Sequence, residues 1–296
     1  MADRTAVGLI GVGLLGQALA SRLLGAGIAV VGIDRDPAKN DKLAQLGGQA
    51  ALSIADLARR CGPIVLAVFS TKEVEEVVEQ ELLPVLEGSD RIVLCASTCD
   101  PDRIAALAAR VAGCGLRLLE TPISGSSGQV GRGEGVGLVG GDPQVAAEIE
   151  LVLRALCPTY FHIGKVGDAG RAKLAINLIL GLNRLALAEG LAFAERLGLD
   201  PAAFLKVARA SACYSQVMDV KGAKMVQRDF APEGRITQHL KDVHLMLEQA
   251  ERVGQSLPLL AVHADVLKAC VGHGEGDLDN SIVIEEIRRR ARRSQP

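Results

Sequence analysis

A lysine and an asparagine one helical turn apart are the residues of this sequence best suited to acid–base chemistry. Lys173 and Asn177 follow a glycine-rich turn and lie in an apolar run that predicts a helix, so their spacing puts both on one helical face. An ammonium group aimed into a cleft can supply the proton that a carbonyl oxygen needs during hydride transfer, and Asn177 can hold that donor or a substrate. A surface lysine with its aliphatic stem along the helix is the alternative.

A glycine motif near the start of the chain predicts a dinucleotide site. Residues 11–16 read G-V-G-L-L-G, between an apolar run that predicts a strand and a run that predicts a helix. In this setting Gly11 permits a tight turn, Gly13 lets the backbone approach a pyrophosphate, and Gly16 lets the helix pack closely on the strand. The free N–H groups at the start of the helix then face the anion. A glycine-rich turn that serves only packing is the alternative.

The acid expected to select the cofactor is Asp34. It ends a second predicted strand and lies 18 residues after Gly16, where a ribose-binding carboxylate is expected. Such a carboxylate accepts hydrogen bonds from the ribose hydroxyls and repels a 2′-phosphate, so we expect NAD in preference to NADP. Arg35 follows directly and could bind that phosphate instead.

Two further polar stretches are candidates for the site. Residues 120–128, E-T-P-I-S-G-S-S-G, follow a predicted strand, and serine hydroxyls and free N–H groups in such a turn can bind a carboxylate. An ordinary polar loop explains this stretch equally well. Lys241-Asp242 lies inside a helical pattern, where a solvated ion pair is the simpler interpretation.

The elements that must position these residues change character along the chain. Up to about Gly167, strands alternate with helices, which predicts a doubly wound, mostly parallel sheet. Asp142-Pro143 and Asp200-Pro201 predict capped helix starts. The predicted strands are 6–10, 28–33, 63–69, 91–96, 116–120, 136–139 and 160–163, and the helices between them are 17–24, 72–86, 101–112 and one starting at Asp142.

The second half of the sequence predicts helices and no strand. We therefore expect two domains, residues 1–166 and 167–296, and a ligand cleft at the carboxyl edge of the sheet. The helical patterns are 170–197, 201–210, 236–253, 259–271 and 281–292.

Composition narrows the classes of protein. The net charge of −2 gives no bulk attraction to nucleic acid or membranes. The seven cysteines are scattered without a C-x-x-C pair, which favours reduced thiols, and no zinc-ligand spacing is present. The first predicted strand leaves no room for a signal peptide, and polar residues interrupt the apolar run 174–197. We therefore expect a cytoplasmic protein without a metal site or a membrane span.

Together these motifs resemble the β-hydroxyacid dehydrogenases, a family that includes 3-hydroxyisobutyrate dehydrogenase and tartronate semialdehyde reductase. The resemblance covers nearly the whole chain. Four motifs match in order: the cofactor motif at 11–16, the substrate motif at 120–126, the catalytic motif at 164–177 and the K-D motif at 241–242. The family fold implied is α/β, an N-terminal Rossmann doubly wound parallel sheet with a C-terminal all-α domain, usually in homodimers or homotetramers.

The resemblance implies a role for each matched residue. Lys173 corresponds to the catalytic lysine and Asn177 to its substrate-binding companion, while Ser124 and Gly125 would hold the carboxylate of a small substrate. Val68 and Phe69 occupy the family's Leu-Pro pair along the cofactor. With the residues inferred above, the expected cofactor contacts are Gly11, Val12, Gly13, Leu14, Leu15, Gly16, Asp34, Arg35, Val68, Phe69, Thr98 and Lys241.

Departures from the family motifs concern specificity more than chemistry. Ser126 replaces the second glycine of the substrate motif and Ser127 adds another hydroxyl, so Ser126 joins the predicted substrate ligands and a hydroxylated substrate is expected. Ala169 stands where the catalytic motif has its third glycine, and Gly170 follows it. The expected activity is hydride transfer between NAD(P) and a short β-hydroxy acid or its semialdehyde. An imine reductase and a non-enzymatic dinucleotide-binding module are the alternatives.

Overall fold

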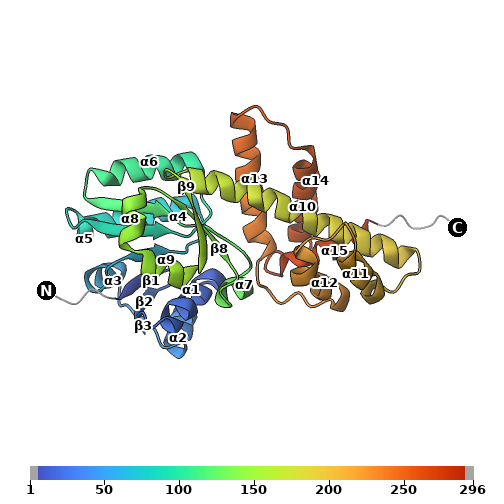
Figure 1. Ribbon diagram of the computed structural model, residues 1–296, viewed down its shortest axis with the longest axis horizontal. Coiled ribbons are helices and arrows are strands. Elements are labelled where there is room, and N and C mark those ends of the chain that lie inside the picture. Colours follow the sequence, from blue (N-terminus) through green and yellow to red (C-terminus); the bar gives the residue numbers. More distant parts are fainter. Residues whose placement is uncertain (1–5, 291–296) are drawn as a thin grey trace. The chain divides into compact units, whose positions relative to one another are not determined.

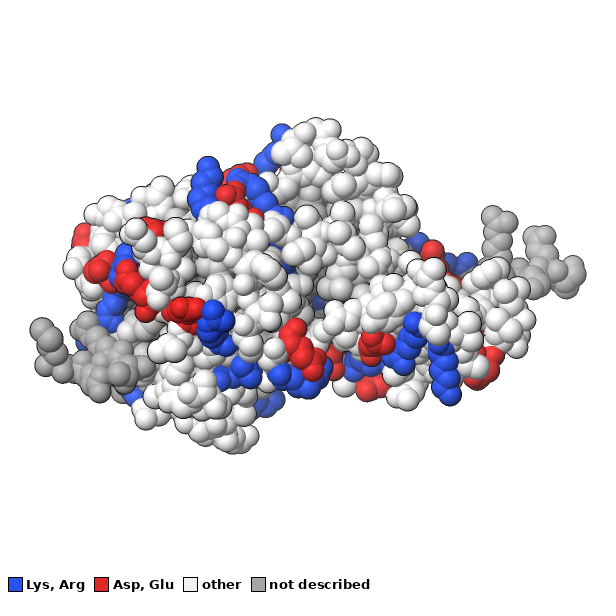
Figure 2. Space-filling view, viewed as in Figure 1, with Lys and Arg blue, Asp and Glu red and all other residues white. Residues whose placement is uncertain are grey.

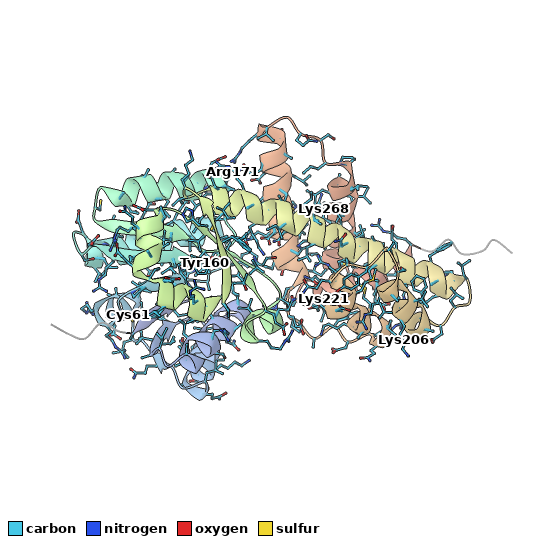
Figure 3. The ribbon with its side chains drawn as sticks, in the orientation of Figure 1. Cys61, Tyr160, Arg171, Lys206, Lys221 and Lys268 are labelled. Atoms are coloured by element: carbon cyan, nitrogen blue, oxygen red, sulfur yellow. The ribbon has the colours of Figure 1, made fainter. Side chains whose placement is uncertain are left out.

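The computed structural model describes residues 6–290, and the chain divides into two compact units, Met1–Lys173 and Leu174–Pro296 (Figure 1). The sequence placed the boundary after residue 166. The structural division lies later because the start of the long helix α10 (Asp168–Arg196) packs on the first unit. Arg171 in that first turn, labelled in Figure 3, donates a hydrogen bond of 2.6 Å to Asp102 of the first unit.

The first unit contains a nine-stranded sheet in the order β3-β2-β1-β4-β5-β6-β8-β7, with β9 paired to β8. Strands β1 to β6 run parallel, β8 runs antiparallel to β6 and β7, and β9 runs parallel to β8. The bounds of the strands are β1 Val7–Ile10, β2 Val30–Ile33, β3 Gln49–Ala50, β4 Ile64–Leu66, β5 Arg91–Cys95, β6 Leu116–Glu120, β7 Ile123–Ser124, β8 Val136–Gly140 and β9 Thr159–Gly164.

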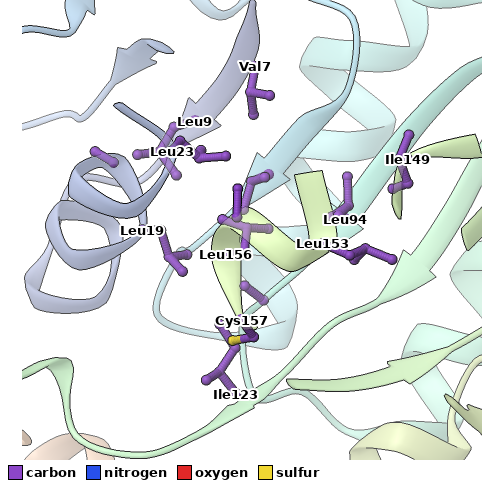
Figure 4. Packing of buried hydrophobic residues seen from close by; sticks show 14 of the residues in the cluster. Val7, Leu9, Leu19, Leu23, Leu94, Ile123, Ile149, Leu153, Leu156 and Cys157 are labelled. Atoms are coloured by element: carbon purple, nitrogen blue, oxygen red, sulfur yellow. The ribbon is translucent and has the colours of Figure 1, made fainter. Parts of the chain in front are cut away.

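Helices cover both faces of this sheet, because its central strands are apolar on both sides. One buried cluster joins the sheet to α1 and α9, and a second joins it to α3, η1 and α6. Figure 4 shows the first cluster, where α1 and α9 meet the sheet through Leu19, Leu23, Leu153 and Leu156. The helices are α1 Leu14–Gly25, α2 Pro37–Gln45, α3 Ile54–Arg60, α4 Thr71–Glu76, η1 Val77–Leu82, α5 Leu83–Leu86, α6 Pro101–Ala112, α7 Ser127–Gly131, α8 Pro143–Glu148 and α9 Glu150–Leu156.

The second unit is helical. Its core is a cluster of leucine, valine, isoleucine and methionine side chains such as Leu191, Met225, Val243 and Leu267. Besides α10 its helices are α11 Pro201–Ala210, α12 Val217–Gln227, α13 Ile236–Arg252, α14 Pro258–Gly272, η2 Asn280–Ile282 and α15 Val283–Arg289.

The fold class predicted from the sequence is confirmed, and so are both capped helix starts. Asp142 accepts from the N–H of Gln144 at 2.8 Å and Asp200 from that of Ala203 at 2.7 Å. The sequence prediction missed α12 altogether, along with the short helices α2, α3 and α7. Helix 72–86 contains a π-helical segment, η1, just before Pro84, and the last two residues of helix 281–292 lie outside the described residues.

The apolar character of α10 has a packing explanation. Among residues 6–290 it is the one helix long and apolar enough to cross a membrane, with 44% of that window buried inside the protein. Leu174, Leu185, Leu187 and Leu191 contribute to the core of the helical unit.

On the face seen in Figure 2, lysine and arginine side chains lie mostly among aspartate and glutamate rather than in one basic patch.

Candidate functional site

The three glycines after β1 have different structural roles. Gly11 has φ +94°, and a Cβ there would lie 2.5 Å from the carbonyl oxygen of Ala67. A Cβ on Gly16 would lie 2.1 Å from the carbonyl oxygen of Gly11, whereas a Cβ on Gly13 would meet nothing within 4 Å. Packing therefore requires two of these glycines, and the third leaves an open cradle. Gly13 is also the N-cap of α1, without a side chain to cap the helix, so the cradle fits an anion such as a pyrophosphate.

Asp34 lies beside this glycine loop, just beyond the end of β2. Its Oδ2 accepts a hydrogen bond of 2.8 Å from the N–H of Val12, and its Oδ1 lies 3.3 Å from Nζ of Lys39. Burial raises the pKa of Asp34, but hydrogen bonds from the N–H groups of Asp36 and Val12 and from Lys39 outweigh it, so the pKa lies below its usual value. The carboxylate is ionised next to the cradle, and Arg35 beside it is exposed.

Val68 and Phe69 lie just beyond the carboxyl end of β4, the strand next to β1 in the sheet, and Thr98 lies just beyond the carboxyl end of β5, the strand after that. The carbonyl of Val68 accepts a hydrogen bond of 2.8 Å from the hydroxyl of Ser97, which links the two segments. The structure thus brings the cofactor residues predicted in the first unit to one edge of its sheet, where ligands of such folds bind.

Lys173 is buried, with 6% of its surface exposed, so it is not a surface lysine. Its Nζ donates a hydrogen bond of 2.7 Å to the carbonyl oxygen of Ile123. Ser124 follows directly, and Gly125 has φ +144°, in the region that favours glycine. The structure therefore brings the predicted acid and the predicted carboxylate loop together within the first unit.

Ser126 has a structural task that the sequence analysis missed. It is the N-cap of α7, and its hydroxyl accepts a hydrogen bond of 3.2 Å from the N–H of Gln129, whose side chain in turn accepts from the N–H of Ser126 at 3.0 Å. A hydroxyl that accepts in a cap retains its own hydrogen for donation. The S-x-x-Q spacing was the signal that could have revealed this capping box.

Asn177 and Lys241 both contact Asp242 in the second unit. Nδ2 of Asn177 donates to Oδ2 of Asp242 at 3.1 Å, and Nζ of Lys241 lies 3.0 Å from Oδ1. Asn177 and Asp242 are buried. The sequence interpretation treated Asp242 only as the neighbour of Lys241, but it is the residue that orients the asparagine amide.

A second buried polar cluster in the helical unit had no clear sequence signal. Nε2 of His239 and Nε2 of His263 are 2.9 Å apart, and burial, with a smaller contribution from Arg184, lowers the pKa of His263 to about 3. Nε and Nη2 of Arg184 are buried without a hydrogen-bond acceptor among the described residues, and burial lowers the pKa of this guanidinium to about 10. Gly181 makes the cluster possible, because a Cβ there would lie 2.7 Å from Nε2 of His239.

Two family models match consecutive parts of the chain. The NAD binding domain of 6-phosphogluconate dehydrogenase matches residues 6–164, and the NAD-binding domain of NADP-dependent 3-hydroxyisobutyrate dehydrogenase matches residues 167–287. The fold and the site therefore define an NAD(P)-dependent oxidoreductase. More specifically, the chain belongs to the β-hydroxyacid dehydrogenase family, as its motifs predicted.

Individual relatives agree with this assignment over nearly the full length. The 2-hydroxy-3-oxopropionate reductase of Escherichia coli is 28% identical over 286 residues, covering 95% of this chain and 96% of that protein. L-threonate dehydrogenase of Cupriavidus necator is 28% identical over 281 residues, covering 94% and 95%. The crystal structure of 3-hydroxyisobutyrate dehydrogenase from Salmonella typhimurium has a TM-score of 0.87 at 24% identity, covering 95% and 99%, and shows the shared fold.

Proposed function

We propose that the enzyme transfers hydride between NAD and a short β-hydroxy acid or its semialdehyde, with Lys173 as the acid–base group. The observation that carries this proposal is the buried ammonium of Lys173, 2.7 Å from the carbonyl oxygen of Ile123. Buried lysines are rare unless they have a partner. Here the partner belongs to the loop that the family motif assigns to the substrate.

The chemistry requires one proton and one hydride. In reduction the hydride adds to the carbonyl carbon, and the ammonium of Lys173 gives its proton to the oxygen as the hydroxyl forms. In oxidation the neutral amine takes the hydroxyl proton while the hydride leaves, so alkaline pH should favour this direction. The bound dinucleotide supplies or accepts the hydride. Because Asp242 accepts from the amide N–H of Asn177, the Asn177 carbonyl oxygen is the group available to orient the ammonium or a substrate hydroxyl.

The proposed cofactor preference rests on Asp34. Its ionised carboxylate next to the glycine cradle can accept from ribose hydroxyls and repels a 2′-phosphate. Arg35 and Lys39 are the nearby cations that oppose this preference. The ratio of kcat/KM for NAD to that for NADP tests it, and a higher value with NADP would refute the assignment.

The proposed substrate is a three- or four-carbon acid that carries an additional hydroxyl. Ser124 and the N–H of Gly125 would bind its carboxylate, and the hydroxyl hydrogen of Ser126 or Ser127 would reach the additional group. The relatives support this class, because both 2-hydroxy-3-oxopropionate and L-threonate carry such a hydroxyl. A site that hydrogen-bonds a hydroxyl discriminates strongly against an analogue without it.

A panel of β-hydroxy acids and semialdehydes, assayed with both cofactors by the absorbance of the reduced nicotinamide, tests the proposal. Hydroxylated acids should exceed 3-hydroxyisobutyrate in kcat/KM, and Ser126→Gly should narrow that difference. This substitution is mild for the fold, since glycine at an N-cap costs only a few tenths of a kcal/mol. If 3-hydroxyisobutyrate is the best substrate and Ser126→Gly leaves the preference unchanged, the serines do not select the substrate.

The enzyme is also proposed to be a cytoplasmic homodimer or homotetramer. All seven cysteines are free, as expected for reduced thiols. Ile179 and Phe193 of α10 and Leu259 of α14 are large apolar side chains exposed on the helical unit, and a second copy would cover such groups. Light scattering should give the mass of a dimer or tetramer, and Phe193→Glu should lower it; a monomer at micromolar concentration would contradict the proposal.

A further inference from the structure

Glu120, the last residue of β6, has a carboxylate buried at the start of α10. Only 2% of its surface is exposed. Its Oε2 accepts a hydrogen bond of 2.5 Å from the N–H of Gly167, and the carboxylate accepts a second bond from the N–H of Gly170. It therefore binds two of the N–H groups that a helix start leaves without intrahelical partners, at the positive end of the helix dipole.

The backbone around this carboxylate leaves space only for glycine. A Cβ on Gly170 would lie 2.6 Å from Oε1 of Glu120, and a Cβ on Gly140 would lie 3.2 Å from Oε2. Gly167 has φ +101°, which favours glycine at that position as well. This geometry accounts for the displaced glycine of the catalytic motif: Ala169 is tolerated because the close approach of Glu120 falls on the next residue.

The loop after β6 and the start of α10 are joined by a second contact, three residues further along each segment. Ile123, three residues after Glu120, accepts the hydrogen bond from Nζ of Lys173, three residues after Gly170. The loop that follows β6 and the first turns of α10 are thus joined at two points. One point is made by Glu120 and backbone N–H groups, and the other by Lys173 itself.

We propose that Glu120 is a positioning residue: its ionised carboxylate fixes the first turn of α10 on the loop after β6 and thereby holds Lys173 at the reacting carbonyl. This inference rests on the proposed function of Lys173 as the acid–base group. The hydrogen bonds of the carboxylate are with backbone N–H groups at the start of the helix. Its effect passes through the helix, because Lys173 lies three residues after Gly170 in α10.

The charges around Glu120 make its ionisation sensitive to pH. Burial raises the pKa of Glu120 to about 7, against the lowering effects of the Gly167 and Gly170 N–H groups and of Arg171, while Asp168 raises it further. Cys95 of β5 also faces it. Arg171 is shared with Asp168 and with Asp102 of α6. Protonation converts one acceptor oxygen into a hydroxyl, so the two-bond attachment is complete only above neutral pH.

The test compares Glu120→Gln with Glu120→Asp in the full-length enzyme. Glu120→Gln should lower kcat about 10- to 100-fold, since a small misplacement of a catalytic group has effects of this size, with a much smaller change in KM. It should also remove the ionisation near pH 7 from the pH profile of kcat. Glu120→Asp keeps the charge and should retain that ionisation with partial activity.

Two further variants separate positioning from general destabilisation. Gly170→Ala leaves the acid in place but adds a methyl group at 2.6 Å from Oε1, so it should lower kcat in the same way. Asp168→Asn removes another carboxylate from the same helical turn. This carboxylate accepts a hydrogen bond from the N–H of Lys165. It is the matched control and should keep the ionisation of Glu120, shifted to somewhat lower pH because Asp168 raises the pKa of Glu120.

Hydrogen exchange at the Gly167 and Gly170 amides, measured without substrate, provides a readout independent of activity. Exchange should accelerate at least tenfold in Glu120→Gln and stay near the parent value in Asp168→Asn. Unchanged exchange would overturn the proposed attachment, and faster exchange with unaltered kcat and pH profile would overturn the positioning role. A third outcome separates the two proposals. If Lys173→Ala retains turnover while Glu120→Gln still accelerates exchange, the acid–base role proposed for Lys173 is refuted, but the attachment of Glu120 to the start of α10 is supported.

Discussion

The two units of this enzyme position their functional groups by different means. The sheet unit relies on backbone: Gly13 leaves a cradle, Gly125 turns the loop, and the N–H groups of Gly167 and Gly170 hold Glu120. The helical unit relies on pairs of side chains, such as Asn177 with Asp242. Backbone groups are placed as soon as the strands and helices form, whereas side-chain pairs also require each rotamer to be fixed by packing.

The two buried charges show the consequence most clearly. The carboxylate of Glu120 accepts two hydrogen bonds from a helix start. The guanidinium of Arg184 has two nitrogens, Nε and Nη2, without an acceptor among the described residues. A buried charge with fixed partners can serve a site, while one without them mainly costs stability. Four predictions test this contrast.

The largest effect is expected at Lys173, the last residue of the first unit. Lys173→Ala should lower turnover about 10²–10⁴-fold, as removal of a general acid–base group does, while cofactor affinity barely changes because Lys173 contacts the loop at Ile123. Steady-state kinetics and calorimetric titration of the cofactor measure both. Lys165→Ala, at an exposed lysine of the preceding turn, is the control. Near-full turnover of Lys173→Ala on the true substrate would disprove the mechanism.

Gly13→Val tests the backbone cradle. A Cβ at this position would meet nothing within 4 Å, so the free energy of unfolding should change by about 0.5 kcal/mol or less, while cofactor binding fails. Calorimetry and thermal unfolding separate the two effects. Gly16→Val should instead destabilise the fold, since its Cβ would lie 2.1 Å from a carbonyl oxygen. Unchanged cofactor affinity in Gly13→Val would mean that the glycine turn serves only packing.

The stability of Glu120→Gln relative to the parent should increase with pH. The pKa of Glu120 is raised from 4.5 to about 7, so between these values the folded protein holds a proton that the unfolded chain has released. The contribution of Glu120 to stability is therefore present below pH 4.5 and is lost as pH rises through 7. From pH 5 to pH 8 the relative gain should be about 2–3 kcal/mol, at about 1.4 kcal/mol per pKa unit.

Chemical denaturation at several pH values measures this gain. Asp34→Asn should show the opposite trend, because the pKa of Asp34 is lowered in the folded state: its stabilising contribution is lost as pH falls, so the variant should lose stability relative to the parent as pH rises. A pH-independent difference between Glu120→Gln and the parent would contradict the neutral-range ionisation of Glu120.

The smallest effect is expected at the buried arginine. Arg184→Met should stabilise the protein by about 1–3 kcal/mol, the cost of leaving buried donors without acceptors, at every pH from 6 to about 9. Asn183→Met, at the exposed neighbouring position, controls for the added apolar side chain. A clear loss of stability in Arg184→Met would show that the guanidinium has an acceptor in solution, and the contrast with Glu120 would disappear.

The sequence was enough to predict three features: the strand–helix alternation, the glycine motif and the Lys173–Asn177 spacing. Each depends on residues close together in the chain. Helix α12 was missed because Gly222 and several polar residues interrupt its apolar pattern. Lys221 there is buried, with its Nζ 2.9 Å from Oδ2 of Asp279. That partner lies 58 residues away, so no local pattern distinguishes this lysine from a solvent-exposed one.

The sequence by itself determined the family, the alternation of the main strands and helices in the first unit, and the identity of the residues with reactive groups, since glycine conformations and helical periodicity are local properties. Only the tertiary structure decided which partners these groups have. Glu120 reaches the helix start 47 residues away, and Asn177 reaches Asp242 across 65 residues. The pKa of Glu120 follows from such contacts, because burial and hydrogen-bond geometry exist only once distant segments have packed together.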